Sequence, residues 1–143
     1  MRTATPANRA NLLIQIGFTL GALAAFLASA SASPVQAQGL RCVATDGDSL
    51  RCGFKRVRVI GLDAPEMRAR CPVELTMARA ARARLAELIE HGVTLHPHGR
   101  DRYRRLLAVV HDAHGRDVAA VLIREGVARG YNGRGRRQGW CGG

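Results

Sequence analysis

The pattern of apolar and polar residues divides the chain into a leader and a short series of strands and helices. A charge-free apolar run covers residues 12–28. Two short strands are predicted within 40–54, on either side of an Asp-Gly-Asp-Ser turn. Residues 55–62 are predicted to form a third strand, apolar on both faces and therefore expected to be buried. Pro65 ends this region, because proline lacks a backbone N–H and restricts the residue before it.

Helical periodicity follows. Residues 72–92 begin with Pro72, end with Gly92 and are rich in alanine, arginine and leucine, a composition that favours a helix. Its apolar positions fall on one stripe, while most of its arginines lie off that stripe and are expected to face solvent.

Two more strands and a short helix complete the prediction. The strands are expected at 93–97 and 106–112, and the helix at 117–126, with Asp117 as its N-cap. The glycine- and arginine-rich tail, 130–143, shows no periodicity and is predicted to be a loop. Three strands, a helix, two strands and a helix are typical of a β-rich α+β fold, a five-stranded OB-fold barrel with two helices.

The N-terminal leader has the features of a signal peptide. Two arginines precede the apolar run, and a segment of small residues follows it, ending in Val35-Gln36-Ala37. We predict a signal peptide over 1–37 and one domain over 38–143; cleavage after Ala32 and a retained membrane anchor are the alternatives. Export to the periplasm or the medium, with no lasting membrane association, is the expectation.

The charge of the predicted domain indicates its class of partner. Without the two leader arginines, 20 basic residues remain against 11 acidic ones, a formal charge of +9, and Lys55 is the only lysine. Because the planar guanidinium binds phosphate oxygens in pairs, this balance favours a polyanion over a cationic partner. A basic surface that only keeps the protein soluble would have the same charge.

Four cysteines lie in the predicted domain, and in an oxidising compartment an even number indicates disulfides. Cys42 and Cys52 are equidistant from Gly47, so a hairpin turning there places them side by side. Cys71 is then left to pair with Cys141. A zinc site is the alternative, but the chain has no Cys-x-x-Cys pair.

Charged residues cluster at three places in the chain where core packing gives no reason for them. They are the aspartates of the 46–48 turn, Arg58 with Asp63 and Glu66, and the arginine-rich segment 100–105. Carboxylates at strand ends are hard ligands suited to calcium. Arginines beside such a metal suit a phosphodiester undergoing attack, and a spare carboxylate can take a proton from water. Together these residues predict phosphodiester hydrolysis.

The chain resembles a known family at these places. The segments TDGDSL, RVRVIGLDAPE, DRYRRLLAVV and LIREGVA have the order and spacing seen in the staphylococcal nuclease-like thermonucleases, over residues 41–131. The resemblance implies an OB-fold enzyme that uses Ca²⁺ to hydrolyse DNA and RNA and leaves 3′-phosphates.

The resemblance also assigns roles. It implies calcium binding by Asp48, Asp63 and the Ala64 carbonyl, phosphate binding by Arg58 and Arg105, and general-base catalysis by Glu66. A non-catalytic OB-fold module that binds nucleic acid is the alternative, but such a module is expected to lack one of these residues. We expect a monomer that acts on DNA and RNA.

One segment departs from the family. Where its members read Asp-x-Tyr-Gly-Arg, this chain has an arginine, Arg104. If that glycine uses a positive φ angle, Arg104 must adopt the same strained conformation or the loop must shift. Arg104 is therefore a second candidate for phosphate binding. Tyr103 is expected to support this loop at the nucleic-acid surface, and Tyr131 is the candidate for stacking on a base.

Overall fold

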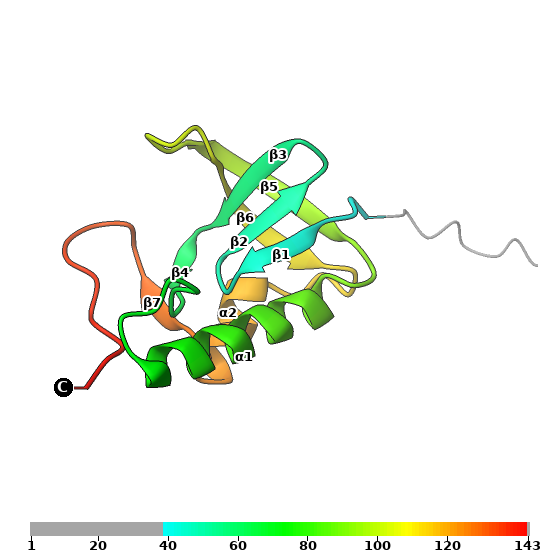
Figure 1. Cartoon of the computed structure of the whole chain (residues 1–143). Coiled ribbons are helices and arrows are strands. Elements are labelled where there is room, and N and C mark those ends of the chain that lie inside the picture. Colours follow the sequence, from blue (N-terminus) through cyan, green and yellow to red (C-terminus); the bar gives the residue numbers. More distant parts are fainter. Residues whose placement is uncertain (1–38, 143) are drawn as a thin grey trace, which may run out of the picture. The chain divides into compact units, whose positions relative to one another are not determined.

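The computed structural model of the protein describes residues 39–142 (Figure 1). The predicted signal peptide and its cleavage sites lie outside the described residues. Within the described part, no helix has the length and apolar character needed to cross a membrane.

Five strands form one sheet, in the order β1-β2-β3-β6-β5. Their bounds are Val43–Asp46 (β1), Ser49–Cys52 (β2), Lys55–Val59 (β3), Val93–Arg100 (β5) and Leu106–Asp112 (β6). All neighbours are antiparallel except β3 and β6, which are parallel. Leu40, just before β1, exchanges two backbone hydrogen bonds with Val93 at the start of β5. The two edges of the sheet are thus joined, as in an OB-fold barrel.

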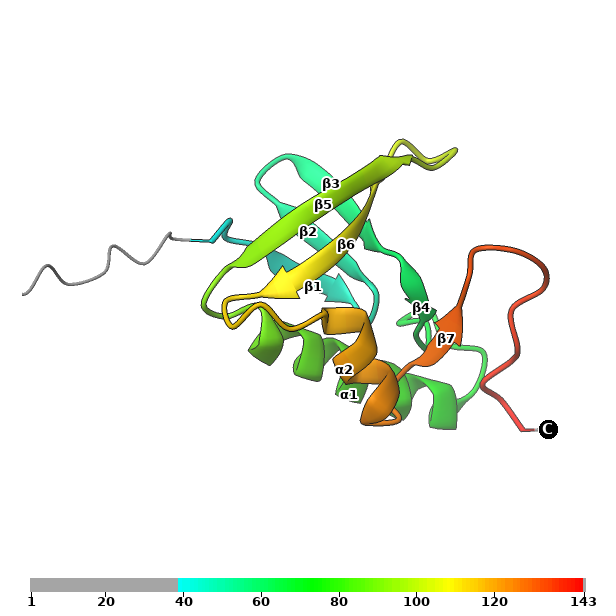
Figure 2. The ribbon, with the colours of Figure 1, turned by 180° about the vertical axis from the view of Figure 1, so that it is seen from behind.

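Two helices cover one end of the barrel, as Figures 1 and 2 show. Helix α1 spans Pro72–Leu88, and its N-cap is Cys71. Helix α2 spans Val118–Arg124, and the Asp117 side chain caps it by accepting from the amides of its first turn, as predicted. The α+β fold and the five main strands expected from the sequence are confirmed.

The core lies between the sheet and the helices. Fully buried side chains from both layers fill it: Leu50, Val57, Leu62, Leu85, Val110 and Leu122. Burial of each such side chain stabilises the fold by roughly 1.5–3 kcal/mol. This packing fixes the strand ends at which the polar residues gather.

Two predicted segments were assigned the wrong structure, whereas α1 and β5 differ from the prediction only in where they end. The single strand expected at 55–62 is divided into β3 and a separate strand β4, Gly61–Asp63. The tail is not loop throughout, because Arg129–Tyr131 forms strand β7, antiparallel to β4. Both differences have one cause. The chain turns at Gly61, which has a φ of 88°, and the turned segment takes a partner 70 residues away in sequence, as the Gly61–Tyr131 pairing shows.

Two disulfides cross-link the domain. They join Cys42 to Cys52 and Cys71 to Cys141, the pairing that the sequence favoured. The first joins Cys42, the residue before β1, to Cys52, the last residue of β2. The second ties the C-terminal tail to the start of α1.

Candidate active site

Strand register brings three of the predicted residues to one end of the barrel. Ser49 of β2 lies opposite Arg58 of β3, and Arg58 lies opposite Leu107 of β6. Asp48 immediately precedes β2, and Arg105 immediately precedes β6. Residues 48, 58 and 105 are therefore neighbours across three adjacent strands.

The turn between β1 and β2 lies against the segment that carries Asp63. A Cβ atom at Gly47 would lie 2.7 Å from the Ala64 Cβ and 2.8 Å from the Ala81 Cβ, so only glycine allows this close approach. As a result the Ala64 amide donates to Asp48 Oδ2 at 3.5 Å, and Ser49 Oγ donates to Asp48 Oδ1 at 2.9 Å. Close packing of the turn therefore orients the Asp48 carboxylate.

Arg58 connects the two aspartates. Its Nη1 forms an ion pair with Asp48 Oδ2, and its Nη2 lies 3.8 Å from Asp63 Oδ1 and donates to the Leu62 carbonyl at 3.4 Å. The Arg58 side chain is only 8 % exposed. Burial, followed by repulsion from Arg137 and Arg105, lowers the pKa of Arg58 to about 10. It therefore stays a cation at neutral pH.

The two buried aspartates fit a hard divalent cation. The Asp48 and Asp63 side chains are 5 % and 8 % exposed, and both lie within reach of one guanidinium, so their oxygens converge. Asp63 Oδ1 is buried and has no hydrogen bond within the described residues. Oxygen donors of this kind suit Ca²⁺ better than a thiolate-preferring metal.

A tight turn before β6 holds Arg105. Asp101 Oδ1 accepts from the amides of Tyr103 and Arg105, each at 2.9 Å, and Oδ2 accepts from Arg105 Nε at 2.7 Å. Burial acts against ionisation, but these hydrogen bonds hold the pKa of Asp101 below its ordinary value. Arg104 adopts φ 61°, the positive angle expected if it replaces a glycine. Its carbonyl accepts from Arg100 Nη1 at 3.0 Å.

The same turn occurs at the other end of β6. Asp112 accepts from the amides of His114 and Arg116, each at 2.9 Å, and from Arg116 Nε at 2.7 Å. The position equivalent to Arg104 is Gly115, with φ 75°. Of these two turns, only the one at 101–105 lines the cleft of the candidate site. The turn at 112–116 therefore has the same structure without the same position, and it can serve as an internal control for the first turn.

These elements surround a cleft of about 1160 Å³. Six of the predicted site residues line it, namely Asp48, Arg58, Glu66, Tyr103, Arg105 and Tyr131. Asp63 and Ala64 are buried beside it, and Arg104 lies outside its lining. The structure therefore brings the predicted carboxylates and two of the three arginines together, and separates Arg104 from them.

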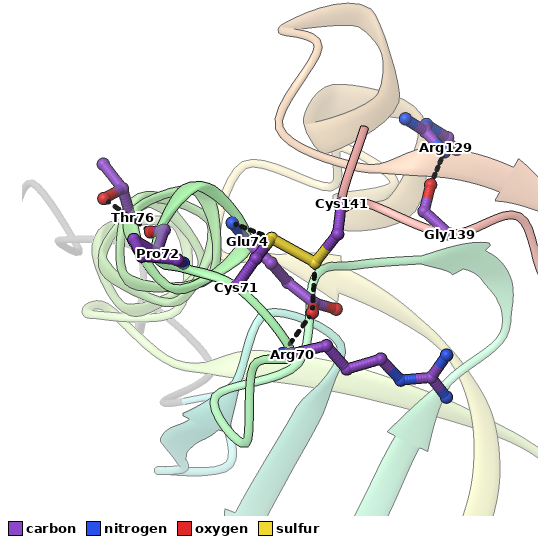
Figure 3. The surroundings of a disulfide bond; sticks show 8 residues. All are labelled: Arg70, Cys71, Pro72, Glu74, Thr76, Arg129, Gly139 and Cys141. Atoms are coloured by element: carbon purple, nitrogen blue, oxygen red, sulfur yellow. Dashed lines mark hydrogen bonds between the residues drawn. A yellow bond between two sulfur atoms is a disulfide. The ribbon is translucent and has the colours of Figure 1, made fainter. Parts of the chain in front are cut away.

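A different group of ligand-type side chains gathers at the second disulfide. Cys71, Glu74 and Cys141 lie close enough to hold a metal. Figure 3 shows the two sulfurs joined to each other, with the Glu74 carboxylate accepting from the Arg70 amide at 2.7 Å. Thiolates are absent from a disulfide, so the structure gives no support to the zinc alternative.

Comparison with protein families shows which family the chain belongs to. The model described as Staphylococcal nuclease homologue matches residues 56–139, more than half of the chain. This chain belongs to the staphylococcal nuclease family. The family match contains Arg58, Asp63, Glu66 and Arg105, whereas Asp48 lies before it. A search of curated proteins returns no significant match.

This staphylococcal nuclease homologue has a cleft residue that sequence reasoning missed. Arg137 lines the cleft, and its Nη1 lies 3.1 Å from Glu66 Oε1 and 3.2 Å from Asp63 Oδ1. The only sequence signal was the run of arginines in the tail. Arg56 was also missed. It lines the cleft and donates from Nη2 to the Tyr103 carbonyl at 2.7 Å, which supports the arginine turn.

Proposed function

We propose that the protein is an exported, calcium-dependent nuclease that hydrolyses phosphodiester bonds of DNA and RNA and leaves 3′-phosphates. The observation that carries this proposal is the position of Arg58. It is a buried cation that lies between two buried aspartates and borders the same cleft as Glu66 and Arg105. Membership of the nuclease family supports the same class of reaction.

Arg58 and Arg105 bind and neutralise the phosphate. Attack on phosphorus increases the negative charge on the phosphoryl oxygens, and fixed cations in a cleft stabilise that charge without having to reorganise. Both arginines are held in place before substrate binds, Arg58 by its carboxylate partners and Arg105 by Asp101. Their orientation is therefore established by folding.

Glu66 takes a proton from the attacking water. Its side chain is 51 % exposed and lines the cleft, so water reaches it directly. A carboxylate in this position acts as a general base and contributes about 10²- to 10⁴-fold to the rate.

A calcium ion would be held by Asp48, Asp63 and the Ala64 carbonyl. A calcium ion bound there would polarise the phosphate and increase the acidity of a nearby water. Ala64 follows Asp63 directly and is buried beside Asp48, whose carboxylate its own amide approaches.

Export is proposed from the leader and supported by the disulfides. Two structural disulfides in a domain of this size are typical of proteins from oxidising compartments. The proposal covers both destinations, the periplasm and the medium.

Digestion of denatured DNA and of RNA by the purified, oxidised protein tests the proposal. Samples with calcium and with EGTA are compared, and the product ends are examined. Cleavage only with calcium, giving 5′-hydroxyl ends that a polynucleotide kinase labels without prior phosphatase, is the expected result. Tight binding without cleavage would make the protein a nucleic-acid-binding module instead.

A further inference from the structure

The C-terminal segment 132–141, which we call the strap, is fixed at both of its ends. Strand β7 precedes it and pairs with β4 through residues 129–131. The Cys71–Cys141 disulfide then fastens its far end to the start of α1. Figures 1 and 2 show the strap leaving β7, arching outward and returning to α1.

Contacts between β7 and the strap keep the strap in place. Arg129 Nη1 donates to the Gly139 carbonyl at 3.0 Å, and the Arg129 guanidinium lies 3.8 Å from the centre of the Trp140 ring (Figure 3 shows the hydrogen bond). Trp140 is buried, and Tyr131 Oη donates to the Gly135 carbonyl at 3.0 Å. The strap therefore has side-chain contacts near both ends in addition to its disulfide.

Arg137 is the residue that the strap places in the cleft. Among the described residues, its hydrogen bond to Glu66 and its ion pairs with Glu66 and Asp63 are made by Nη1, which leaves Nη2 and Nε able to donate to a ligand. It also lies 5.6 Å from the centre of the Tyr131 ring. The side chain is 40 % exposed, so a bound molecule can reach it. Its neighbour Arg136 is exposed and does not line the cleft.

We propose that Arg137 is a third phosphate-binding arginine, which the Cys71–Cys141 disulfide delivers to the cleft. It binds a phosphate of the polynucleotide through the donors that Glu66 and Asp63 leave free, while Glu66 and Tyr131 hold the guanidinium in place. The proposal rests on the proposed function in one respect, which is that the ligand is a nucleic acid.

The three proposed phosphate ligands then border one cleft from three separate parts of the fold. Arg58 comes from β3, Arg105 from the turn before β6, and Arg137 from the strap. The first two are fixed by strands that form the barrel. The third depends on a covalent bond that reduction can break, so substrate affinity depends on the oxidation of the second disulfide.

Direct binding measurements test the role of Arg137. The anisotropy of a fluorescein-labelled single-stranded oligonucleotide is titrated with oxidised protein in EGTA, at several salt concentrations. Arg137→Ala should weaken binding at least fivefold and reduce the slope of log affinity against log salt by about 0.7, the value for one phosphate contact on a single strand. Arg136→Ala removes the same charge from the same strap and should change affinity less than about twofold, in keeping with its place outside the cleft.

The disulfide is tested in the same assay. Replacing both Cys71 and Cys141 by serine releases the strap, and the serine hydroxyl in place of the Cys71 sulfur still offers an N-cap acceptor to α1. This variant should lose as much affinity as Arg137→Ala, and adding Arg137→Ala to it should have little further effect. Thermal unfolding checks that it is folded, and if it is not, the comparison of Arg137→Ala with Arg136→Ala decides.

Two results would overturn the proposal. One is wild-type affinity and salt slope in Arg137→Ala. The other is tighter binding by that variant, which would make Arg137 a competitor of the substrate for Glu66 and Asp63. Because binding is measured without calcium, the outcome is separate from cleavage. If binding depends on Arg137 but the protein does not cleave nucleic acid, the role of Arg137 is retained and the nuclease activity is refuted. If the protein cleaves nucleic acid but binding does not depend on Arg137, the nuclease activity is retained and the role of Arg137 is refuted.

Discussion

The two equivalent turns at the ends of β6 allow the role of Arg105 to be measured against an internal control. Asp101→Asn keeps one oxygen for the two backbone amides but loses the carboxylate oxygen that accepts from Arg105 Nε. Asp112→Asn makes the same change for Arg116. Each substitution removes one charge-assisted hydrogen bond, which at these partly exposed arginines is worth about 1 kcal/mol.

Stability and activity should therefore respond differently. Both variants should unfold about 4–8 °C below the wild type, the usual shift for 1 kcal/mol in a domain of this size. Only Asp101→Asn frees an arginine that borders the cleft, and a misplaced phosphate ligand costs up to about 100-fold in rate. We expect kcat/KM on denatured DNA, at saturating calcium, to fall about 10- to 100-fold in Asp101→Asn and less than twofold in Asp112→Asn. Equal losses of activity in the two variants would refute the reasoning.

The same ion pair predicts a pH dependence. Because the folded-state pKa of Asp101 is lowered by its Arg105 hydrogen bonds, the stability it contributes is fully present above the ordinary value of 3.8 and is lost as pH falls through the lower folded value. The difference in Tm between wild type and Asp101→Asn should be constant near neutral pH and shrink below about pH 3.8. A difference that grew on acidification would contradict the assigned direction.

Two other substitutions test the backbone and the covalent frame. Arg104→Gly should stabilise the protein by about 0.5–1 kcal/mol in thermal unfolding, because a left-handed φ costs an arginine more than a glycine. The same substitution should leave kcat/KM within twofold of the wild type. A tenfold loss would show that Arg104 contacts the substrate. Replacing the disulfide cysteines by serine should cost about 4 kcal/mol for Cys71–Cys141 and about 3 kcal/mol for Cys42–Cys52, since the bridged residues are 70 and 10 positions apart. The reverse order in urea unfolding would show that loop closure does not govern their contributions.

Local signals were sufficient for most of the fold. Period-two and apolar segments predicted the five main strands, Pro72 marked the start of α1, and Asp117 marked the cap of α2. These features depend on residues close together in sequence, which is why patterns reveal them.

The missed features depend on distant partners. Strand β7 is only three residues long, lacks an apolar pattern and forms because β4 offers a free edge. Arg137 gave no local sign of its place, because its position follows from the pairing of β7 and from the Cys71–Cys141 link. The sequence favoured that link, but only the three-dimensional structure shows that the linked segment places Arg137 in the cleft.

The most direct test of the central claim compares Glu66→Gln with a matched variant in calcium and in EGTA. Glu90→Gln removes the same charge from an exposed site outside the cleft and serves as the control. Cleavage of denatured DNA should require calcium, should fall about 10²- to 10⁴-fold in Glu66→Gln, and should be unchanged in Glu90→Gln. Calcium-independent cleavage, or a loss of less than tenfold in Glu66→Gln, would contradict the account of this cleft as a calcium-dependent nuclease site.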